Sequence, residues 1–206
     1  MSGPFGSIRN MKQLDLGLRT WGGKRRGAGR KLVHDRRSVP HRRRPRFRWK
    51  PLHVTVRVRR EIWNLRTHRC FRALKRAFSK GCDRFGFRLV HFSVQGNHLH
   101  LIVEAPDHLQ LGRAMKGLEV RMARALNKVI RRKGQVFAGR YHAHILRWPR
   151  EVRLAIGYVL NNRALHAARE QTPLPERYVD PLTSESTRGH DPPLVADARL
   201  WLLRTA

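Results

Sequence analysis

Two short motifs in this chain have the residue types and the spacing of a metal site. They are His98-Leu99-His100 and His142-Ala143-His144. Side chains at positions i and i+2 of a β-strand point to the same face, so each pair would present two imidazoles side by side. Imidazole nitrogen is a common ligand of divalent transition metals. The chain has 12 histidines, however, and roughly one such pair is expected by chance, so the spacing alone does not identify a site.

The residues around the first motif strengthen it. Leu99, Leu101 and Val103 alternate with His98 and His100, so the apolar side chains would face a core and the histidines would face the opposite way. The same polar face should carry three side chains of an earlier predicted strand: His53, Thr55 and Arg57.

The second motif has less support. His142 and His144 lie on a shorter predicted strand, and Ala143 between them is a poor core anchor. We therefore predict that the first pair holds a divalent ion, and we keep the second pair as the alternative. Two imidazoles rarely suffice for a metal that must also keep positions open for substrate, so a third ligand should come from another element.

A helix predicted at residues 149–170 contains the other candidates, Tyr158 and Asn162. These residues are four apart, so they project from one face of the helix, one turn from each other. The adjacent apolar stripe consists of Val152, Ile156 and Val159. If this stripe packs on the domain, the tyrosine and the asparagine lie at its edge and can face the histidine pair. Taken alone, the helix pattern favours a simpler interpretation, in which Tyr158 is an ordinary residue at the margin of the core.

Hydrophobic periodicity predicts the elements that position these residues. Apolar alternation predicts strands at 52–58, 87–95, 98–106 and 139–147. Helical spacing predicts helices at 67–86, 107–133 and 149–170. The order β-α-β-β-α-β-α predicts an α+β fold. We expect a ferredoxin-like (split βαβ) antiparallel sheet with helices on one face, and an extra C-terminal helix that carries the tyrosine.

The net charge is the strongest compositional signal. Lys and Arg number 45 against 14 Asp and Glu, which gives a formal net charge of +31. Such a charge opposes compaction by self-repulsion, and a polyanion such as nucleic acid would neutralise it. Residues 1–50 contain sixteen Lys and Arg and two acids. This stretch is predicted to be a flexible basic arm that grips phosphates, and an unstructured tail with no specific role is the alternative.

The chain is expected to have three parts: the arm at 1–50, a folded domain at 51–170, and a proline-rich extended C-terminal tail at 171–206. The N-terminus has no apolar signal segment, and no run reaches membrane-spanning length. The two cysteines, Cys70 and Cys82, match no zinc pattern. A reduced, cytoplasmic protein is the expectation.

Several segments together resemble a known family. The run VHFSVQGNHLHLIVEAP is followed by a long helix, then by VFAGRYHAHIL, then by AIGYVLNNRALHA. This order is similar to that of the REP-associated tyrosine transposases, which are relatives of the single-tyrosine HUH insertion-sequence transposases. The resemblance covers roughly residues 50–168. Its motif is His-hydrophobic-His plus a tyrosine on a downstream helix with an amide four residues later, and it is specific when all parts occur in order.

The resemblance implies a metal-dependent enzyme that cleaves and rejoins single-stranded or hairpin DNA. In that family the two histidines bind Mg²⁺ or Mn²⁺, which maps to His98 and His100, and the helical amide that can complete the metal site maps to Asn162. The tyrosine that attacks the DNA backbone maps to Tyr158, and the implied products are a 5′-phosphotyrosyl link and a free 3′-hydroxyl. The chain departs from the family where Arg163 stands in place of the usual proline, and in its longer basic arm.

Basic and aromatic side chains should supply the DNA contacts. The candidates for phosphate binding are Arg57, Arg59, Arg60, Lys116, Arg121, Arg124 and Arg140. Trp148 and Tyr141 are candidates for stacking on unpaired bases. The alternative is that these are solvated charges and packed aromatics. Two other functions stay open, a nucleic-acid-binding module without catalysis and a domesticated transposase that binds DNA without moving it. The protein could be a monomer or a homodimer.

Overall fold

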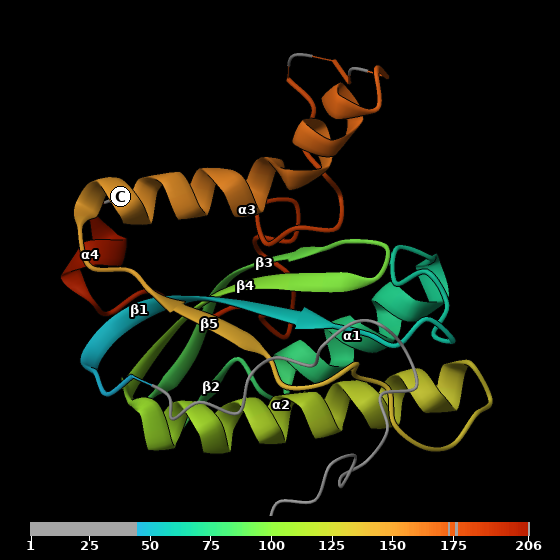
Figure 1. Ribbon diagram of the computed structural model, residues 1–206, viewed down its shortest axis with the longest axis horizontal. Coiled ribbons are helices and arrows are strands. Elements are labelled where there is room, and N and C mark those ends of the chain that lie inside the picture. The colour runs from blue at the N-terminus through green and yellow to red at the C-terminus, as the bar shows by residue number, and fades with distance from the viewer. Residues whose placement is uncertain (1–44, 173, 176, 206) are drawn as a thin grey trace, which may run out of the picture. The chain divides into compact units, whose positions relative to one another are not determined.

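The computed structural model describes residues 45–172, 174–175 and 177–205 (Figure 1). Most of the predicted basic arm, residues 1–44, lies outside the described residues. The strands are β1 (Arg48–Arg57), β2 (Asp83–Arg84), β3 (Phe87–Val94), β4 (His98–Asp107) and β5 (His142–Ile145). The helices are α1 (His68–Ser79), α2 (His108–Val129), α3 (Pro149–Arg169) and α4 (Trp201–Arg204).

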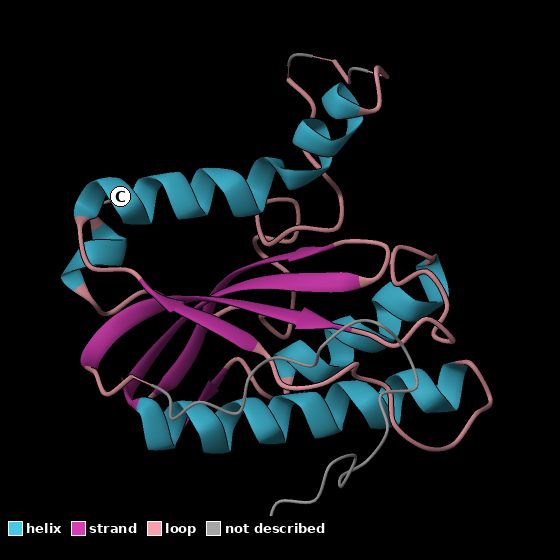
Figure 2. Cartoon of the chain, viewed as in Figure 1, coloured by secondary structure: helices cyan, strands magenta, loops and turns pink. Residues whose placement is uncertain are grey.

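The strands form one antiparallel sheet in the order β2-β3-β4-β1-β5 (Figure 2). Without the two-residue β2, the order β3-β4-β1-β5 is that of the split βαβ arrangement, with the first and third long strands at the centre. The predicted α+β, ferredoxin-like fold is therefore confirmed. The central strand β4 carries the histidine pair, His98 and His100.

The main core lies on one face of the sheet, beneath α1 and α2. Alternation along the two central strands sends Val54 and Val56 of β1, and Leu99 and Leu101 of β4, into this core. Each helix begins at a side chain that accepts hydrogen bonds from its first turn, Thr67 for α1 and Asp107 for α2. Such a cap stabilises a helix by about 1 kcal/mol. The residues of β1 and β4 that alternate with these face the opposite side of the sheet.

Helix α3 covers that opposite face, so the sheet lies between α1 and α2 on one side and α3 on the other (Figure 1). A second, smaller core joins α3 to the sheet. It consists of Val90, Ile102, Leu146, Val152, Val159 and Leu203. The apolar stripe predicted from Val152 and Val159 therefore does pack on the domain. The extra helix covers the sheet face that the first two helices leave free.

The predicted helix at 67–86 is too long. Helix α1 ends at Ser79, and the chain then forms β2 and a tight hairpin into β3. The two residues of the hairpin turn, Phe85 and Gly86, have φ of 53° and 80°. Two successive positive φ angles are typical of the turn that joins two-residue hairpins, and a helix cannot contain them.

Three other boundaries also differ from the prediction. Strand β1 begins at Arg48, inside the stretch assigned to the basic arm. Helix α2 ends at Val129, four residues before the predicted end, and β5 has four residues where nine were expected. The pattern of apolar residues at the end of a strand or helix does not show whether the backbone there still finds a hydrogen-bond partner, so element ends are predicted less accurately than their centres.

The C-terminal segment after α3 lies along β3. The backbone N–H of Val94 donates to Leu182, that of Ser184 donates to Phe92, and that of Ala196 donates to Leu89. These bonds occupy the edge of β3 beyond the short β2. The segment ends in α4, which lies beside the first turns of α3 (Figure 1).

Candidate active site

The histidine pair of β4 faces α3, on the side of the sheet opposite the main core. The Nε2 atoms of His98 and His100 are 3.0 Å apart, and the two rings are nearly perpendicular, at 89°. Two ligands of an octahedral ion at right angles, each about 2.1 Å from the metal, are about 3.0 Å apart. The pair therefore has the separation that two ligands of one metal ion require.

Neighbouring groups orient both rings through their Nδ1 atoms. Asn97 Oδ1 lies 2.7 Å from His98 Nδ1, and this oxygen can only accept, so Nδ1 of His98 carries the proton. His100 Nδ1 lies 3.0 Å from His53 Nε2 and 3.3 Å from Thr55 Oγ1. A proton on Nδ1 leaves the lone pair on Nε2, which is the arrangement that metal-binding histidines need. The predicted position of His53 and Thr55 beside the pair is confirmed.

His98, His100 and His53 are held in their neutral form. Burial lowers the pKa of His100 to about 3, with further lowering from the charges of His98, His53 and His166. Burial likewise lowers the pKa of His53 to about 4, helped by His144 and His142. The pKa of His98 is lowered mainly by burial and then by Arg57 and His166. Neutral imidazoles are available at neutral pH, and only neutral imidazole binds a metal.

Tyr158 lies against the histidine pair. Its ring packs edge-to-face on His100, with centroids 5.3 Å apart, and on His53, with centroids 5.9 Å apart. The tyrosine is still 39% exposed, so a substrate can reach it. A side chain 58 residues downstream of His100 in the sequence is thus placed beside it within the same chain.

Asn162 is the one member of the predicted site that is fully enclosed. It is 1% exposed, and neither Oδ1 nor Nδ2 has a hydrogen-bond partner among the described residues. A buried amide without partners costs free energy, and such a group usually signals an ion or a water that completes it. It lies one turn beyond Tyr158 on α3.

One further residue of this site was missed from the sequence. His166 is near enough to lower the pKa of both His98 and His100. It follows Asn162 by one turn, so positions 158, 162 and 166 form one row along α3. This four-residue spacing was the signal that could have identified it.

The donor set fits a hard or borderline divalent ion. Among the residues that the structure describes, no three His, Cys, Asp or Glu side chains come together as a metal site. The unpartnered amide oxygen of Asn162 is of the kind that Mg²⁺ and Mn²⁺ accept. Two imidazoles and one amide oxygen leave positions open for a phosphate.

The alternative pair lies on the same face but at the edge of the sheet. His142 pairs in register with Thr55, and His144 with His53. Both are exposed, and His144 Nε2 is 2.6 Å from Glu151 Oε1. The carboxylate of Glu151 therefore already occupies one ring nitrogen of His144.

The aromatic candidates for base stacking differ in exposure. Tyr141 is 8% exposed and belongs to the main core, so the expectation that it stacks on DNA bases is wrong. Its apolar ring fills space between the sheet and the helices, which the strand pattern around it did not reveal. Trp148 is 70% exposed and remains available.

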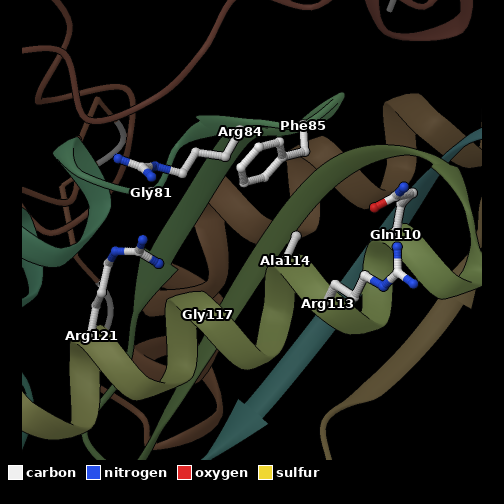
Figure 3. A pocket seen from close by; sticks show the side chains of 8 residues that line it. All are labelled: Gly81, Arg84, Phe85, Gln110, Arg113, Ala114, Gly117 and Arg121. Atoms are coloured by element: carbon white, nitrogen blue, oxygen red, sulfur yellow. The ribbon is translucent and has the colours of Figure 1, made fainter.

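The basic candidates lie on both sides of the sheet. Arg57, Arg60 and Arg140 are exposed, whereas Arg59 is tied to Glu61 and Gln135. Arg121 lines a hollow of about 390 Å³ on the α2 side (Figure 3). The hollow lies between α2 and the β2–β3 hairpin, and its charged lining residues are Arg84, Arg113 and Arg121. Phe85 stands at its rim, 85% exposed.

A family model described as "Transposase IS200 like" matches residues 51–161, which is more than half of the chain. The chain belongs to the IS200-like transposase family. This membership places it among DNA-processing enzymes and confirms the family expected from the histidine and tyrosine motif. The matched residues include His98, His100 and Tyr158 and end just before Asn162.

A solved structure agrees with the fold of this IS200-like transposase. A REP-associated tyrosine transposase bound to a REP hairpin is 19% identical, with a TM-score of 0.53 over 62% of this chain and 74% of that one. A protein described as a putative transposase from Deinococcus radiodurans is 15% identical, with a TM-score of 0.41 over 66% of this chain and 100% of that one. A comparison with curated proteins finds no match.

None of the described helices of this transposase combines the length and the apolar character needed to cross a bilayer.

Proposed function

We propose that this transposase cleaves and rejoins single-stranded or hairpin DNA through a covalent tyrosine intermediate, with Tyr158 as nucleophile. One observation carries the proposal. The ring of Tyr158 lies against His100, whose Nε2 is 3.0 Å from that of His98. An accessible phenol beside two neutral imidazoles is the arrangement that metal-assisted attack on a phosphodiester needs.

In the cleavage step, the phenolic oxygen of Tyr158 attacks the phosphorus of the scissile phosphodiester. A bond forms between this oxygen and phosphorus, and the bond between phosphorus and the 3′ oxygen breaks. The phenol gives up one proton and the departing oxygen gains one, so the products are a 5′-phosphotyrosine and a free 3′-hydroxyl. The covalent link conserves the energy of the broken bond, so attack by a 3′-hydroxyl can reverse the step and rejoin DNA.

His98, His100 and Asn162 would hold Mg²⁺ or Mn²⁺. A bound divalent ion supplies a Lewis acid that neutralises charge on the phosphate oxygens. The protein's own contribution is orientation. Asn97, Thr55 and His53 fix the two imidazoles, and the packing of α3 fixes the tyrosine next to them.

The substrate class follows from the family and from the surface. The structural relative is bound to a REP hairpin. On this chain, the exposed ring of Trp148 lies at the start of the tyrosine helix, where it can stack on an unpaired base.

The direct test of the proposed function is to incubate the protein with single-stranded and hairpin DNA and Mg²⁺ or Mn²⁺. A covalent protein–DNA band on a denaturing gel supports the proposal. DNA binding without any adduct would favour a domesticated, non-catalytic protein instead.

The basic arm should bind phosphates and therefore make DNA affinity depend on salt. Because β1 begins at Arg48, a truncation that tests the arm must remove only residues 1–44. The slope of log K against log salt should become shallower by about 0.7 to 0.9 for each phosphate that the arm neutralises, because fewer counterions are released on binding. Fluorescence anisotropy with a labelled hairpin at several salt concentrations measures this slope. An unchanged slope would mean that the arm does not bind phosphates.

The hollow beside α2 should be a second phosphate-binding surface. Three arginines line it, and the described residues around it include no acidic side chain. Replacing Arg84, Arg113 and Arg121 with glutamine should weaken hairpin binding and lower the salt slope. The rate of adduct formation at saturating DNA should not change, because the hollow lies on the sheet face opposite Tyr158. The matched control replaces Arg69, Arg72 and Arg76, three exposed arginines of α1. Equal losses of affinity in the two triple variants would show that only total charge matters.

A further inference from the structure

A buried carboxylate lies on the same strand face as the histidine pair. Glu104 follows His98, His100 and Ile102 at alternate positions of β4, so all four side chains point toward the α3 side of the sheet. Glu104 is 0% exposed. A buried charge of this kind persists only where partners compensate it fully.

The partners of Glu104 come from β3 and from the C-terminus. Arg88 Nε donates to it at 2.7 Å from the adjacent strand. The backbone N–H groups of Arg199 and Leu200 donate to it at 3.0 Å and 2.7 Å. Leu200 is the N-cap residue immediately before α4. The carboxylate of Glu104 therefore joins strand β4 to the residues just before α4, about a hundred residues away in sequence.

Helix α4 in turn packs against the helix that carries Tyr158. Leu203 of α4 is buried in the same small core as Val152 and Val159 of α3, and Leu202 packs against that core. Figure 1 shows α4 beside the first turns of α3. Val159 is the immediate neighbour of Tyr158, so the core that includes Leu203 sets the position of the nucleophile. Among the described residues this core is much smaller than the main one, so each member contributes a large share of its packing.

We propose that Glu104 is a positioning residue for Tyr158, which it acts on through α4 and the small core under α3; the catalytic part of this proposal rests on the proposed function. The C-terminal segment is then part of the active-site architecture of this chain and not an accessory tail. Loss of the Glu104 carboxylate releases the first turn of α4, loosens Leu203, and lets α3 shift relative to the histidines. A misplacement on the order of 1 Å can cost about 100-fold in rate.

The chain offers a closely matched control. Asp180 is also a buried carboxylate, and it accepts from Arg66 Nη1 and Nη2 at 2.8 Å each and from the backbone N–H of Leu182 at 3.0 Å. It anchors the same C-terminal segment to Arg66, which lies just before α1 and also donates to the carbonyl of Val94, and none of these bonds involves α4. Glu104→Gln and Asp180→Asn therefore remove the same kind of interaction at two places, and only the first is connected to α3.

Two measurements test the proposal. The first is the single-turnover rate of adduct formation at saturating DNA, together with DNA affinity. Glu104→Gln should lower the rate by about 10- to 100-fold with unchanged affinity, and Asp180→Asn should leave both unchanged.

The second measurement needs no catalysis. The chain has three tyrosines, so fluorotyrosine labelling gives few ¹⁹F signals, and Tyr158→Phe identifies that of Tyr158. This signal should shift or broaden in Glu104→Gln and not in Asp180→Asn.

A second route guards against a folding defect in the first variant. Leu203→Ala should lower the rate and move the ¹⁹F signal of Tyr158 as Glu104→Gln does. Leu203→Met should largely return the rate and the signal to those of the unmodified protein, because it refills the core. If Glu104→Gln and Leu203→Ala leave the ¹⁹F signal and the rate as in the unmodified protein, the proposal is overturned. If the unmodified protein forms no adduct but the ¹⁹F signal still moves, the positioning role stands and the proposed catalytic function fails.

Discussion

Tyr158→Phe is expected to abolish the covalent protein–DNA adduct completely. The change removes only the hydroxyl, and no other group in the row on α3 has an oxygen nucleophile that can replace it. The remaining ring can keep its edge-to-face packing on His100 and His53. Folding, Mn²⁺ binding and DNA binding should therefore persist. A denaturing gel with labelled hairpin DNA, read together with a thermal melt and a binding isotherm, separates these effects.

The matched control for this substitution is Tyr178→Phe. Tyr178 is a half-buried tyrosine of the C-terminal segment that interacts with Arg66 and does not belong to α3. Loss of its hydroxyl should leave adduct formation intact. An adduct that survives in Tyr158→Phe would refute the assignment of the nucleophile. Tyr141 would not be an attractive replacement, because it is buried in the core under the opposite face of the sheet.

His100→Ala should lower the rate of adduct formation by more than about 100-fold at a fixed low Mn²⁺ concentration. Changes to groups that only orient a metal ligand cost about 10- to 100-fold in affinity, and removal of a ligand itself should cost more. Raising Mn²⁺ should restore part of the rate, because a weakened site still fills by mass action. His98→Ala, in a less buried position, should behave alike, and Asn162→Ala should show a milder loss.

The controls for the metal site are His142→Ala and His144→Ala. These residues share the sheet face with His98 and His100 but lie at its edge, and both variants should keep cleavage. The rate measured against Mn²⁺ concentration for each variant gives an apparent affinity and a maximal rate. If His100→Ala lowers the maximal rate without changing the apparent Mn²⁺ affinity, His100 is not a metal ligand. If His142→Ala and His144→Ala show the larger losses, the metal site lies at the second pair.

Local patterns in the sequence were sufficient to predict several features of this protein. Alternation along β4 separates Leu99 and Leu101 from His98 and His100, and the structure has these pairs on opposite faces. The helix with Tyr158 and Asn162 on one row occurs within one residue of its predicted bounds. These features depend on backbone periods of 2 and 3.6 residues, which short stretches of sequence display directly.

Only the tertiary structure decided that the histidines of β4 meet the row of side chains on α3 that contains Tyr158. Tyr158 reaches His100 because Val152 and Val159 are buried against Ile102 and Val90, and a pairing between elements so distant in sequence leaves no periodic trace. The same holds for the burial of Tyr141 and for the bond from Glu104 to the start of α4. A periodic pattern shows which side of an element is apolar, but the partner on that side depends on how all the apolar faces are buried together. The position of Tyr158 beside the histidines is therefore a property of the packing of this transposase.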